Sequence, residues 1–365
     1  MLAQIDEYRE KKLIDEVLSE IHKISSKNIT LMEVCGGHTM AIHKSGIPSM
    51  LPANIKLLSG PGCPVCVTSK YFIDEAAALS RIENIIITTF GDLMRVPGSL
   101  TSLSKEKAEG RDIRMVYSTL DALQTAKNNP DKKVIFLGIG FETTTPSSAA
   151  AIIEAEESGL SNFFILSAHK VMPPAMSALI DDGVRINGYI CPGHVSTITG
   201  SSIFLPIVEN YGIGCVVSGF EPLDILQTIY LLVKQNETGT PSLENQYTRA
   251  VTKEGNQKAL NLMNKVFEPR QDWWRGLGEI PDSGLKIKND YVKYDAHRVF
   301  DPVYEKGAEE EEGCRCGDVL KGQINPPECP LFSRVCTPGN PVGACMVSSE
   351  GACAAWHRYS GGQSV

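Results

Sequence analysis

Two cysteines separated by two residues form the sharpest chemical signal in this sequence of 365 residues. Cys63 and Cys66 stand in the segment GPGCPVC, directly after an apolar run. A Cys-X-X-Cys pair at the start of a helix brings its sulfurs within bonding reach, and the positive helix end favours the thiolate. The pattern favours redox chemistry or transient metal binding. Structural zinc and plain packing are the alternatives, and zinc would need a second close cysteine pair, which this half of the chain lacks.

Cys35 also follows an apolar run, and two glycines and His38 come next. The glycines allow the backbone to approach a ligand closely. A thiolate here would be a soft ligand suited to iron, and His38 would act as a second ligand or a proton carrier. The alternative is a buried cysteine beside a histidine that caps the loop. Cys215, inside an apolar run, is expected in the core, and the role of Cys191 stays open.

Six of the 11 cysteines fall within the last 52 residues. Four thiolates from one loop-rich segment can hold a [4Fe–4S] cluster, although zinc and a purely structural disulfide tail are alternatives. Cys314, Cys329, Cys336 and Cys353 have 14, 6 and 16 residues between them. Cys316 and Cys345 would then form a disulfide or remain spare thiols, and the sequence does not decide which four of the six bind.

The composition excludes several classes of partner. The net charge of −8 argues against a broad surface for nucleic acid or anionic lipid. The N-terminal segment is charged throughout, which is unlike an export signal, and no apolar run approaches the roughly 18 residues that span a bilayer. We therefore expect a cytoplasmic protein with no membrane and no nucleic-acid partner, whose cysteines serve metal or redox chemistry.

The elements that must position these residues are short apolar strands repeated every 21 to 30 residues. This spacing fits a strand plus a covering helix, and near-continuous apolar strands predict parallel sheets buried on both faces. Eight strands are expected to end at Val34, Ser59, Thr89, Tyr117, Gly138, Ser167, Cys191 and Ser218. We predict an α/β fold with two similar four-stranded, Rossmann-like domains and a third, mainly helical and loop-rich domain carrying the iron–sulfur cluster.

The polar segment KNNPDKK at 127–133 is taken as the boundary between the two sheets. The predicted domains are 28–129, 130–238, and a third domain made of 1–27 plus 239–365. A faint duplication, CGGH at 35–38 and CPGH at 191–194, supports this division. Helices are expected over the first 23 residues and around 248–267, and the acidic run from Glu309 to Glu312 is expected to be a solvated surface loop.

Polar residues recur where the predicted strands end. Asp92, Glu142 and His194 all hold such positions. Ligands of parallel α/β sheets bind at the carboxyl ends of strands, so these residues would bind a partner's nucleotide, orient a ligand or carry protons. Hydrogen bonding to the loop backbone is the alternative for each. No GxxxxGK[ST] motif is present, so ATP hydrolysis has no support. Trp273 and Trp274 are expected to serve packing or partner docking.

Taken together, these motifs resemble the HypD family of [NiFe]-hydrogenase maturation factors. The resemblance covers nearly the whole chain and rests on MEVCGGHTMAI, LLSGPGCPVCV, FLGIGFETTTPSSA, CPGHVSTI, EGCRCGDVLKG and ECPLFSRVCTPGNPVGACMVSSEGACAAW. It implies a scaffold on which iron receives cyanide and carbon monoxide to form the Fe(CN)2CO unit. It implies complexes with the small chaperone HypC, which adds a cysteine thiolate, and with HypE, which donates cyanide as a thiocyanate, and so an indirect link to the hydrogenase large subunit.

The resemblance also implies roles for individual residues. Cys35 would be the iron ligand with His38 beside it, and Cys63 and Cys66 would be the dithiol/disulfide pair. The [4Fe–4S] cluster would be held as in ferredoxin:thioredoxin reductase, by Cys314, Cys329, Cys336 and Cys353. Whether such a scaffold counts as an enzyme stays open. The alternatives are a stand-alone, cluster-dependent disulfide reductase and a binding platform with a purely structural cluster.

Overall fold

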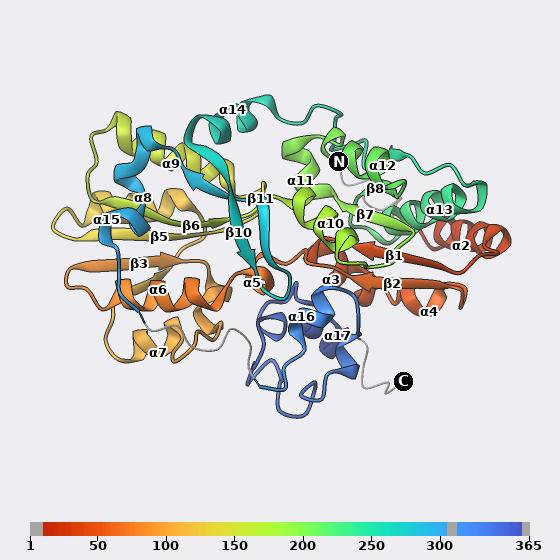
Figure 1. The fold of residues 1–365 in the computed structure, drawn as a ribbon, viewed down its shortest axis with the longest axis horizontal. Coiled ribbons are helices and arrows are strands. Elements are labelled where there is room, and N and C mark those ends of the chain that lie inside the picture. The colour runs from red at the N-terminus through yellow and green to blue at the C-terminus, as the bar shows by residue number, and fades with distance from the viewer. Residues whose placement is uncertain (1–9, 305–311, 360–365) are drawn as a thin grey trace.

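The protein, described here by a computed structural model over residues 10–304 and 312–359, contains two parallel β-sheets that lie side by side (Figure 1). Sheet A has the order β2-β1-β7-β8-β9 and sheet B the order β4-β3-β5-β6. The strands of sheet A are β1 (Ile29–Glu33), β2 (Ile55–Ser59), β7 (Gly188–Pro192), β8 (Gly214–Ser218) and β9 (Leu243–Asn245). Those of sheet B are β3 (Ile85–Thr89), β4 (Ile113–Met115), β5 (Lys133–Gly140) and β6 (Phe163–His169). All eight predicted strands are confirmed, and β9 was not predicted.

The division of the strands between the sheets differs from the prediction. Strands β3 and β4 pair with β5 and β6, whereas β1 and β2 share a sheet with β7 and β8. A boundary at 129/130 would separate β3 from β5, yet Ile85 pairs with Lys133, so the predicted domains 28–129 and 130–238 are wrong as sheet units. The polar segment at 127–133 is a short turn between a helix and the strand that follows it.

Each strand of the sheets is followed by helical connections, as the repeat predicts. In chain order these are α3 (Gly36–Lys44), α4 (Ile47–Met50), α5 (Pro64–Val67), α6 (Lys70–Ser80), η1 (Gly91–Arg95), α7 (Leu103–Ala108), α8 (Thr119–Asn128), α9 (Thr145–Glu157), α10 (Met172–Asp181), α11 (Gly193–Thr199), η2 (Ser202–Phe204), α12 (Leu205–Tyr211) and α13 (Pro222–Thr238). Helix α13 shows why they start and stop. Glu221 and Asp224 form a capping box, Pro222 occupies the first turn, and Gly239 ends the helix at φ +69°.

The predicted third domain is divided among three places. Helix α2 (Lys11–Ile24) confirms the predicted N-terminal helix from residue 11 onward, and residues 1–9 of that prediction lie outside the described residues. The helix packs on sheet A through Ile21 and its neighbours. Residues 257–300 cover sheet B and form α14 (Gln257–Val266), β10 (Phe267–Trp274), β11 (Gly278–Ile287), η3 (Asn289–Tyr294) and α15 (Ala296–Phe300). Helix α14 is shorter than predicted, and β10 and β11 form an antiparallel hairpin.

Of the predicted third domain, only the cysteine-rich tail forms a layer outside the two sheets and the elements that cover them. It contains α16 (Cys316–Leu320), η4 (Pro326–Glu328), η5 (Ala344–Met346) and α17 (Ala352–Tyr359). It lies below the junction of the two sheets, near α3 and α5 (Figure 1). Of the predicted acidic loop, residues 309–311 lie outside the described residues, and Glu312 is exposed.

One hydrophobic core joins both sheets and the tail. Buried members include Leu58 and Val217 of sheet A, Ile87 of sheet B, Trp274 of the hairpin, and Cys345 of the tail. Two smaller clusters lie under the helices on the outer faces of the sheets. Across the described part of the chain, no helix has the length and apolar character needed to cross a bilayer.

Candidate functional site

The loop that carries Cys35 packs directly on the loop that leads to Cys63. The N–H of Gly36 donates to the carbonyl of Gly62 over 3.0 Å, and a Cβ on Gly62 would lie 2.1 Å from the Cys35 nitrogen. Only glycine fits this close approach. Burial raises the pKa of the Cys35 thiol to about 12, and the negative charge of Glu350 adds to the rise. The thiol is therefore neutral near pH 7, and a metal that binds it must displace the proton.

His38 is fully buried, and its protonation state follows from its neighbours. Its Nε2 lies 2.9 Å from the Gly219 carbonyl and 3.2 Å from the Ser218 carbonyl. Because carbonyls only accept hydrogen bonds, Nε2 must carry the proton and Nδ1 must hold a lone pair. That Nδ1 is buried with no hydrogen-bond partner among the described residues. Burial lowers the pKa of His38 to about 4, so the ring is neutral and its free lone pair can bind a metal.

The duplicated motif meets the first copy because β1 and β7 are neighbours in sheet A. The imidazoles of His38 and His194 both stack on the ring of Phe220, with ring centroids 4.5 and 3.8 Å away. His194 is exposed, whereas His38 is not. The two copies of the motif therefore lie at two adjacent strand ends of one sheet. In the sequence they stand on opposite sides of the predicted boundary at 127–133, which the repeat was taken to support.

Cys63 and Cys66 form a disulfide at the start of the four-residue helix α5. Both are buried, with exposed fractions of 4% and 0%. The Cys66 sulfur lies 4.0 Å from the backbone oxygen of Ala344, which directly precedes Cys345 in the tail. The CxxC pair thus lies between the Cys35 loop on one side and the tail on the other.

The tail cysteines gather around one small cavity, lined by Cys314, Cys316, Cys329, Cys336, Cys345 and Cys353. The sulfurs of Cys316 and Cys345 are 2.6 Å apart, and hydrogen bonds from Cys314 and Cys345 lower the pKa of Cys316. Thiol donors alone around a loop-built cavity fit an iron–sulfur cluster. In the described ranges no three His, Cys, Asp or Glu side chains stand close enough to enclose a metal ion, so these sulfurs would have to move closer together to hold a cluster.

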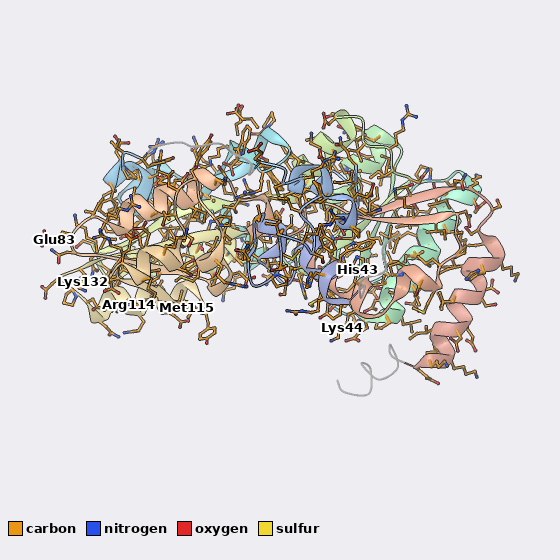
Figure 2. The ribbon with its side chains drawn as sticks, turned by 90° about the horizontal axis from the view of Figure 1, so that it is seen from below. His43, Lys44, Glu83, Arg114, Met115 and Lys132 are labelled. Carbon is orange, nitrogen blue, oxygen red and sulfur yellow. A yellow bond between two sulfur atoms is a disulfide. The ribbon has the colours of Figure 1, made fainter. Side chains whose placement is uncertain are left out.

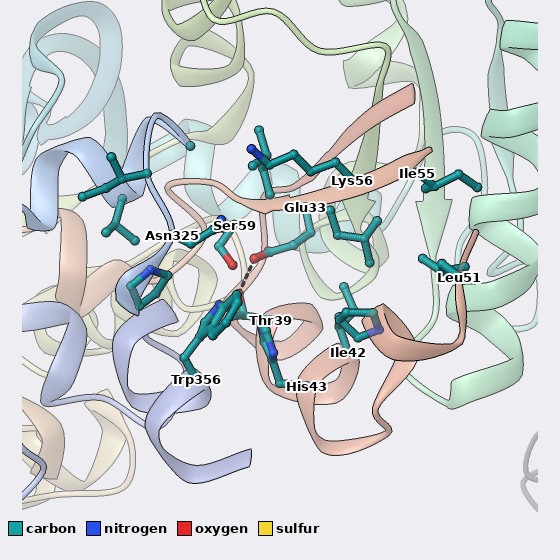
Figure 3. A pocket seen from close by; sticks show the side chains of 17 residues that line it. Glu33, Thr39, Ile42, His43, Leu51, Ile55, Lys56, Ser59, Asn325 and Trp356 are labelled. Atoms are coloured by element: carbon teal, nitrogen blue, oxygen red, sulfur yellow. Dashed lines mark hydrogen bonds between the residues drawn. The ribbon is translucent and has the colours of Figure 1, made fainter. Parts of the chain in front are cut away.

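A second cavity of about 210 Å³ opens beside the Cys35 loop, between α3, β2 and the tail (Figure 3). Its wall includes Glu33, which accepts hydrogen bonds from the Thr39 hydroxyl and, over 2.9 Å, from the Cys35 N–H. Burial raises the pKa of Glu33 to about 8. Trp356 of the tail lies 4.9 Å from the His43 ring at the same cavity. A carboxyl that exchanges protons near neutral pH thus connects this cavity to the Cys35 backbone.

Two other predicted residues lie at the end of sheet B. Glu142 accepts a hydrogen bond from the Met172 N–H over 3.1 Å, while its Oε2 is buried without a partner among the described residues. Burial raises its pKa to about 7. Asp92 is exposed and accepts a 2.8 Å hydrogen bond from Ser348, so it anchors the tail to sheet B. This contact accounts for Asp92 without a chemical role.

Known proteins match this chain along nearly its whole length. The HypD family model, described as "Hydrogenase formation hypA family", matches residues 12–360. The chain belongs to the HypD family. It is 44% identical to the hydrogenase maturation factor HypD of Azotobacter vinelandii over 98% of this chain and 97% of the relative. It is 46% identical to HypD2 of Bradyrhizobium diazoefficiens, covering 97% and 96%, and 42% identical to HypD of Cupriavidus necator, covering 98% and 97%.

Three residues of this HypD-family chain were not singled out from the sequence. Glu33 stands two residues before Cys35 and is buried at the same strand end. Glu350 packs on Gly36, where a Cβ would lie 2.5 Å from the Glu350 Cβ. Arg275 is 4% exposed and contacts α5. Only Glu33 had a sequence signal, a carboxylate inside an apolar strand; the other two depend on contacts between distant segments.

Proposed function

We propose that this chain is a scaffold for the iron of the [NiFe]-hydrogenase active site, acting in the cytoplasm with a small HypC-type chaperone. The observation that supports it best is the meeting of Cys35, the lone pair of His38 and the Cys63–Cys66 disulfide at adjoining loops. In this proposal the iron is cargo rather than a resident cofactor, and its Fe(CN)2CO form is passed on toward the hydrogenase large subunit.

Cys35 supplies the thiolate and His38 Nδ1 the nitrogen ligand, while the chaperone's cysteine completes the protein ligands. Both donors are presented to iron in suitable states, since the imidazole is already neutral. The thiol must lose its proton when iron binds. The chain thus offers one soft and one borderline ligand and leaves the other positions open for cyanide and carbon monoxide.

The reduced Cys63–Cys66 pair supplies the two electrons that release cyanide from a HypE-type donor. The donor's S–CN bond breaks, its sulfur leaves as a thiol, cyanide leaves as hydrogen cyanide or passes to the iron, and Cys63 and Cys66 close into a disulfide. One partner thiocyanate and two thiols give one partner thiol, hydrogen cyanide and one disulfide, so atoms and electrons balance. The pair is adjacent to the Cys35 loop, as this step requires.

The tail would hold a [4Fe–4S] cluster through Cys314, Cys329, Cys336 and Cys353, which line the same cavity. Cys316 and Cys345 are then left as the closely spaced pair beside it. When bound, such a cluster supplies electrons one at a time, and two of them restore the dithiol.

Anaerobic co-purification with the HypC-type chaperone, followed by infrared spectroscopy, tests the proposal. We expect bands of metal-bound cyanide and carbon monoxide in the wild type, their loss in Cys35→Ala, and their retention in the control Cys215→Ala, which lies in the core of sheet A. Bands that persist in Cys35→Ala would remove Cys35 as the iron ligand. Cys63→Ala separates the scaffold from a platform with an inert cluster, because only the platform would still support hydrogenase maturation.

A further inference from the structure

A buried arginine joins the helix of the CxxC pair to the tail. Arg275 lies at the tip of the β10–β11 hairpin and is 4% exposed. Its backbone N–H donates to the Val67 carbonyl over 3.0 Å. Its guanidinium donates twice to the Thr68 carbonyl, from Nε over 3.2 Å and from Nη2 over 3.0 Å. Among the described residues, no carboxylate accepts a hydrogen bond from this guanidinium. Burying a guanidinium against backbone carbonyls is a costly arrangement that the fold nevertheless keeps.

The same tip contacts the tail at the cysteine pair. A Cβ on Gly276 would lie 2.4 Å from the Gly317 Cα, and Gly276 has φ +78°, so glycine is needed there on both counts. Gly317 directly follows Cys316 in the chain, so the tip lies against the start of the cysteine-rich tail. The tip therefore lies between α5 and the start of α16, with a fixed contact on each side.

The hairpin that carries this tip is rigidly held. Trp274 is fully buried and donates from Nε1 to the Ser283 hydroxyl over 2.8 Å. Lys170, also buried, donates to the Trp273 carbonyl over 2.7 Å and pairs with Asp272 over 2.6 Å. Because the tip is anchored in this way, it can hold the segments that it contacts at fixed positions. The hairpin runs between the two sheets toward α5 and the tail (Figure 1).

We propose that Arg275 is a positioning residue that sets the distance between the Cys63–Cys66 pair and the tail cysteines, so that electrons reach the disulfide through the tail. The inference rests on the proposed function. Opening the disulfide consumes two electrons and two protons and yields two thiols. A low-potential one-electron donor outside the chain supplies both electrons in succession. The 4.0 Å contact of Cys66 with the residue before Cys345 is the separation that Arg275 holds.

The test uses the full-length protein, purified anaerobically with its tail iron intact. Titanium(III) citrate is added, and mass spectrometry after alkylation follows the opening of Cys63–Cys66 with time. A Cys336→Ala variant gives the background rate of disulfide opening that does not depend on the tail. Arg275→Met removes the guanidinium and keeps the apolar stem, and Gly276→Ala keeps Arg275 but pushes the tip off Gly317. Arg114→Met removes a guanidinium that makes two hydrogen bonds at the far end of the molecule (Figure 2), so it serves as the control.

In Arg275→Met and Gly276→Ala, tail-dependent opening should slow by about 10- to 100-fold, as expected for a displacement of about 1 Å. Iron content, visible absorbance and the glutathione equilibrium of Cys63–Cys66 should stay as in the wild type, and Arg114→Met should change nothing. The role of Arg275 would be overturned if both tip variants opened the disulfide at the wild-type rate. It would also be overturned if the slower opening were fully explained by a shifted glutathione equilibrium of Cys63–Cys66. If the wild type opens no faster than Cys336→Ala, the proposed redox function fails instead.

Discussion

At the scale of single residues, burial shifts the pKa values of Cys35, His38 and Glu142 in favour of their neutral forms. The pKa of Cys35 rises to about 12, that of His38 falls to about 4 and that of Glu142 rises to about 7, each mainly because burial disfavours the charged form. The neutral His38 imidazole can offer a lone pair directly, whereas the Cys35 thiol must first lose its proton before it can bind a cation. Strongly shifted pKa values at strand ends are common at functional sites.

Gly62→Ala tests the contact that places Cys35. The added Cβ would meet backbone atoms of Val34 and Cys35 within 2.4 Å, and backbone cannot rotate away. We expect a loss of stability of about 1–3 kcal/mol and loss of bound iron, because relief requires the two loops to separate. Gly339→Ala, with nothing within 4 Å, is the matched control, and urea unfolding with iron analysis is the measurement. Wild-type iron content in Gly62→Ala would contradict the placement.

Glu142→Gln should make the protein more stable at alkaline pH. The folded-state pKa is raised from 4.5 to about 7, so the folded protein favours the protonated acid, and stability is lost as pH rises from about 4.5 to 7. Glutamine keeps the neutral form and the acceptor for Met172. The free energy of unfolding of the variant should exceed that of wild type by up to about 3 kcal/mol at pH 8, with no difference at pH 4.5. A gain of equal size at both pH values would show that the carboxyl does not titrate as inferred.

The sequence predicts the residues that carry the chemistry of this site better than it predicts the residues that hold them in place. Cys35, Cys63 and Cys66 stand out because thiols beside glycine at strand ends have few structural uses. Glu350 and Arg275 could not be found this way, since a lone charged residue in a loop is normally a solvated one. Their importance comes from contacts with segments more than 200 residues away. No local pattern encodes such a contact.

At the scale of elements, the strand positions could be predicted and their sheet membership could not. The apolar runs define β1 to β8 because most of these strands are buried on both faces, although the edge strands β2 and β4 are partly exposed. Which strands pair depends on the sheet to which each crossover helix leads. Helix α6 carries the chain from sheet A to sheet B, and nothing unusual in the composition of this helix marks the change of sheet. Pro130 misled the prediction because a proline after a helix marks an ordinary turn as well as a domain boundary.

Arg95 connects η1 to the tail, and its removal should loosen the tail locally. Its guanidinium donates to the carbonyls of Pro338 over 2.9 Å and Val347 over 3.2 Å. In Arg95→Ala, amide hydrogens of residues 338–347 should exchange about fivefold faster, equivalent to about 1 kcal/mol for hydrogen bonds at a partly exposed site. Arg114→Ala, which is far from the tail, is the control. Unchanged exchange over 338–347 would mean that Asp92 and the core hold the tail alone.

At the scale of the whole molecule, the two sheets and the tail are not independent units. A single core cluster includes residues of both sheets, the hairpin and four of the six tail cysteines, and Cys314 packs against it. The working loops meet at this junction, so movement of either sheet would change the distances between Cys35, the CxxC pair and the tail. The proposed metal chemistry would draw on three distant segments, and a shared core holds them at fixed distances, whereas separate domains would move relative to one another.

The shared core predicts one cooperative unfolding transition. Ile87 of sheet B and Val217 of sheet A are both fully buried members of the cluster. Ile87→Ala should cost about 2–5 kcal/mol and Val217→Ala somewhat less, and each should lower the midpoint of the same single transition. Calorimetry of the reduced, iron-free protein measures this directly. Two transitions, each moved by only one of the variants, would mean that the sheets unfold separately and that bound iron or a partner, rather than the core, fixes their relative position.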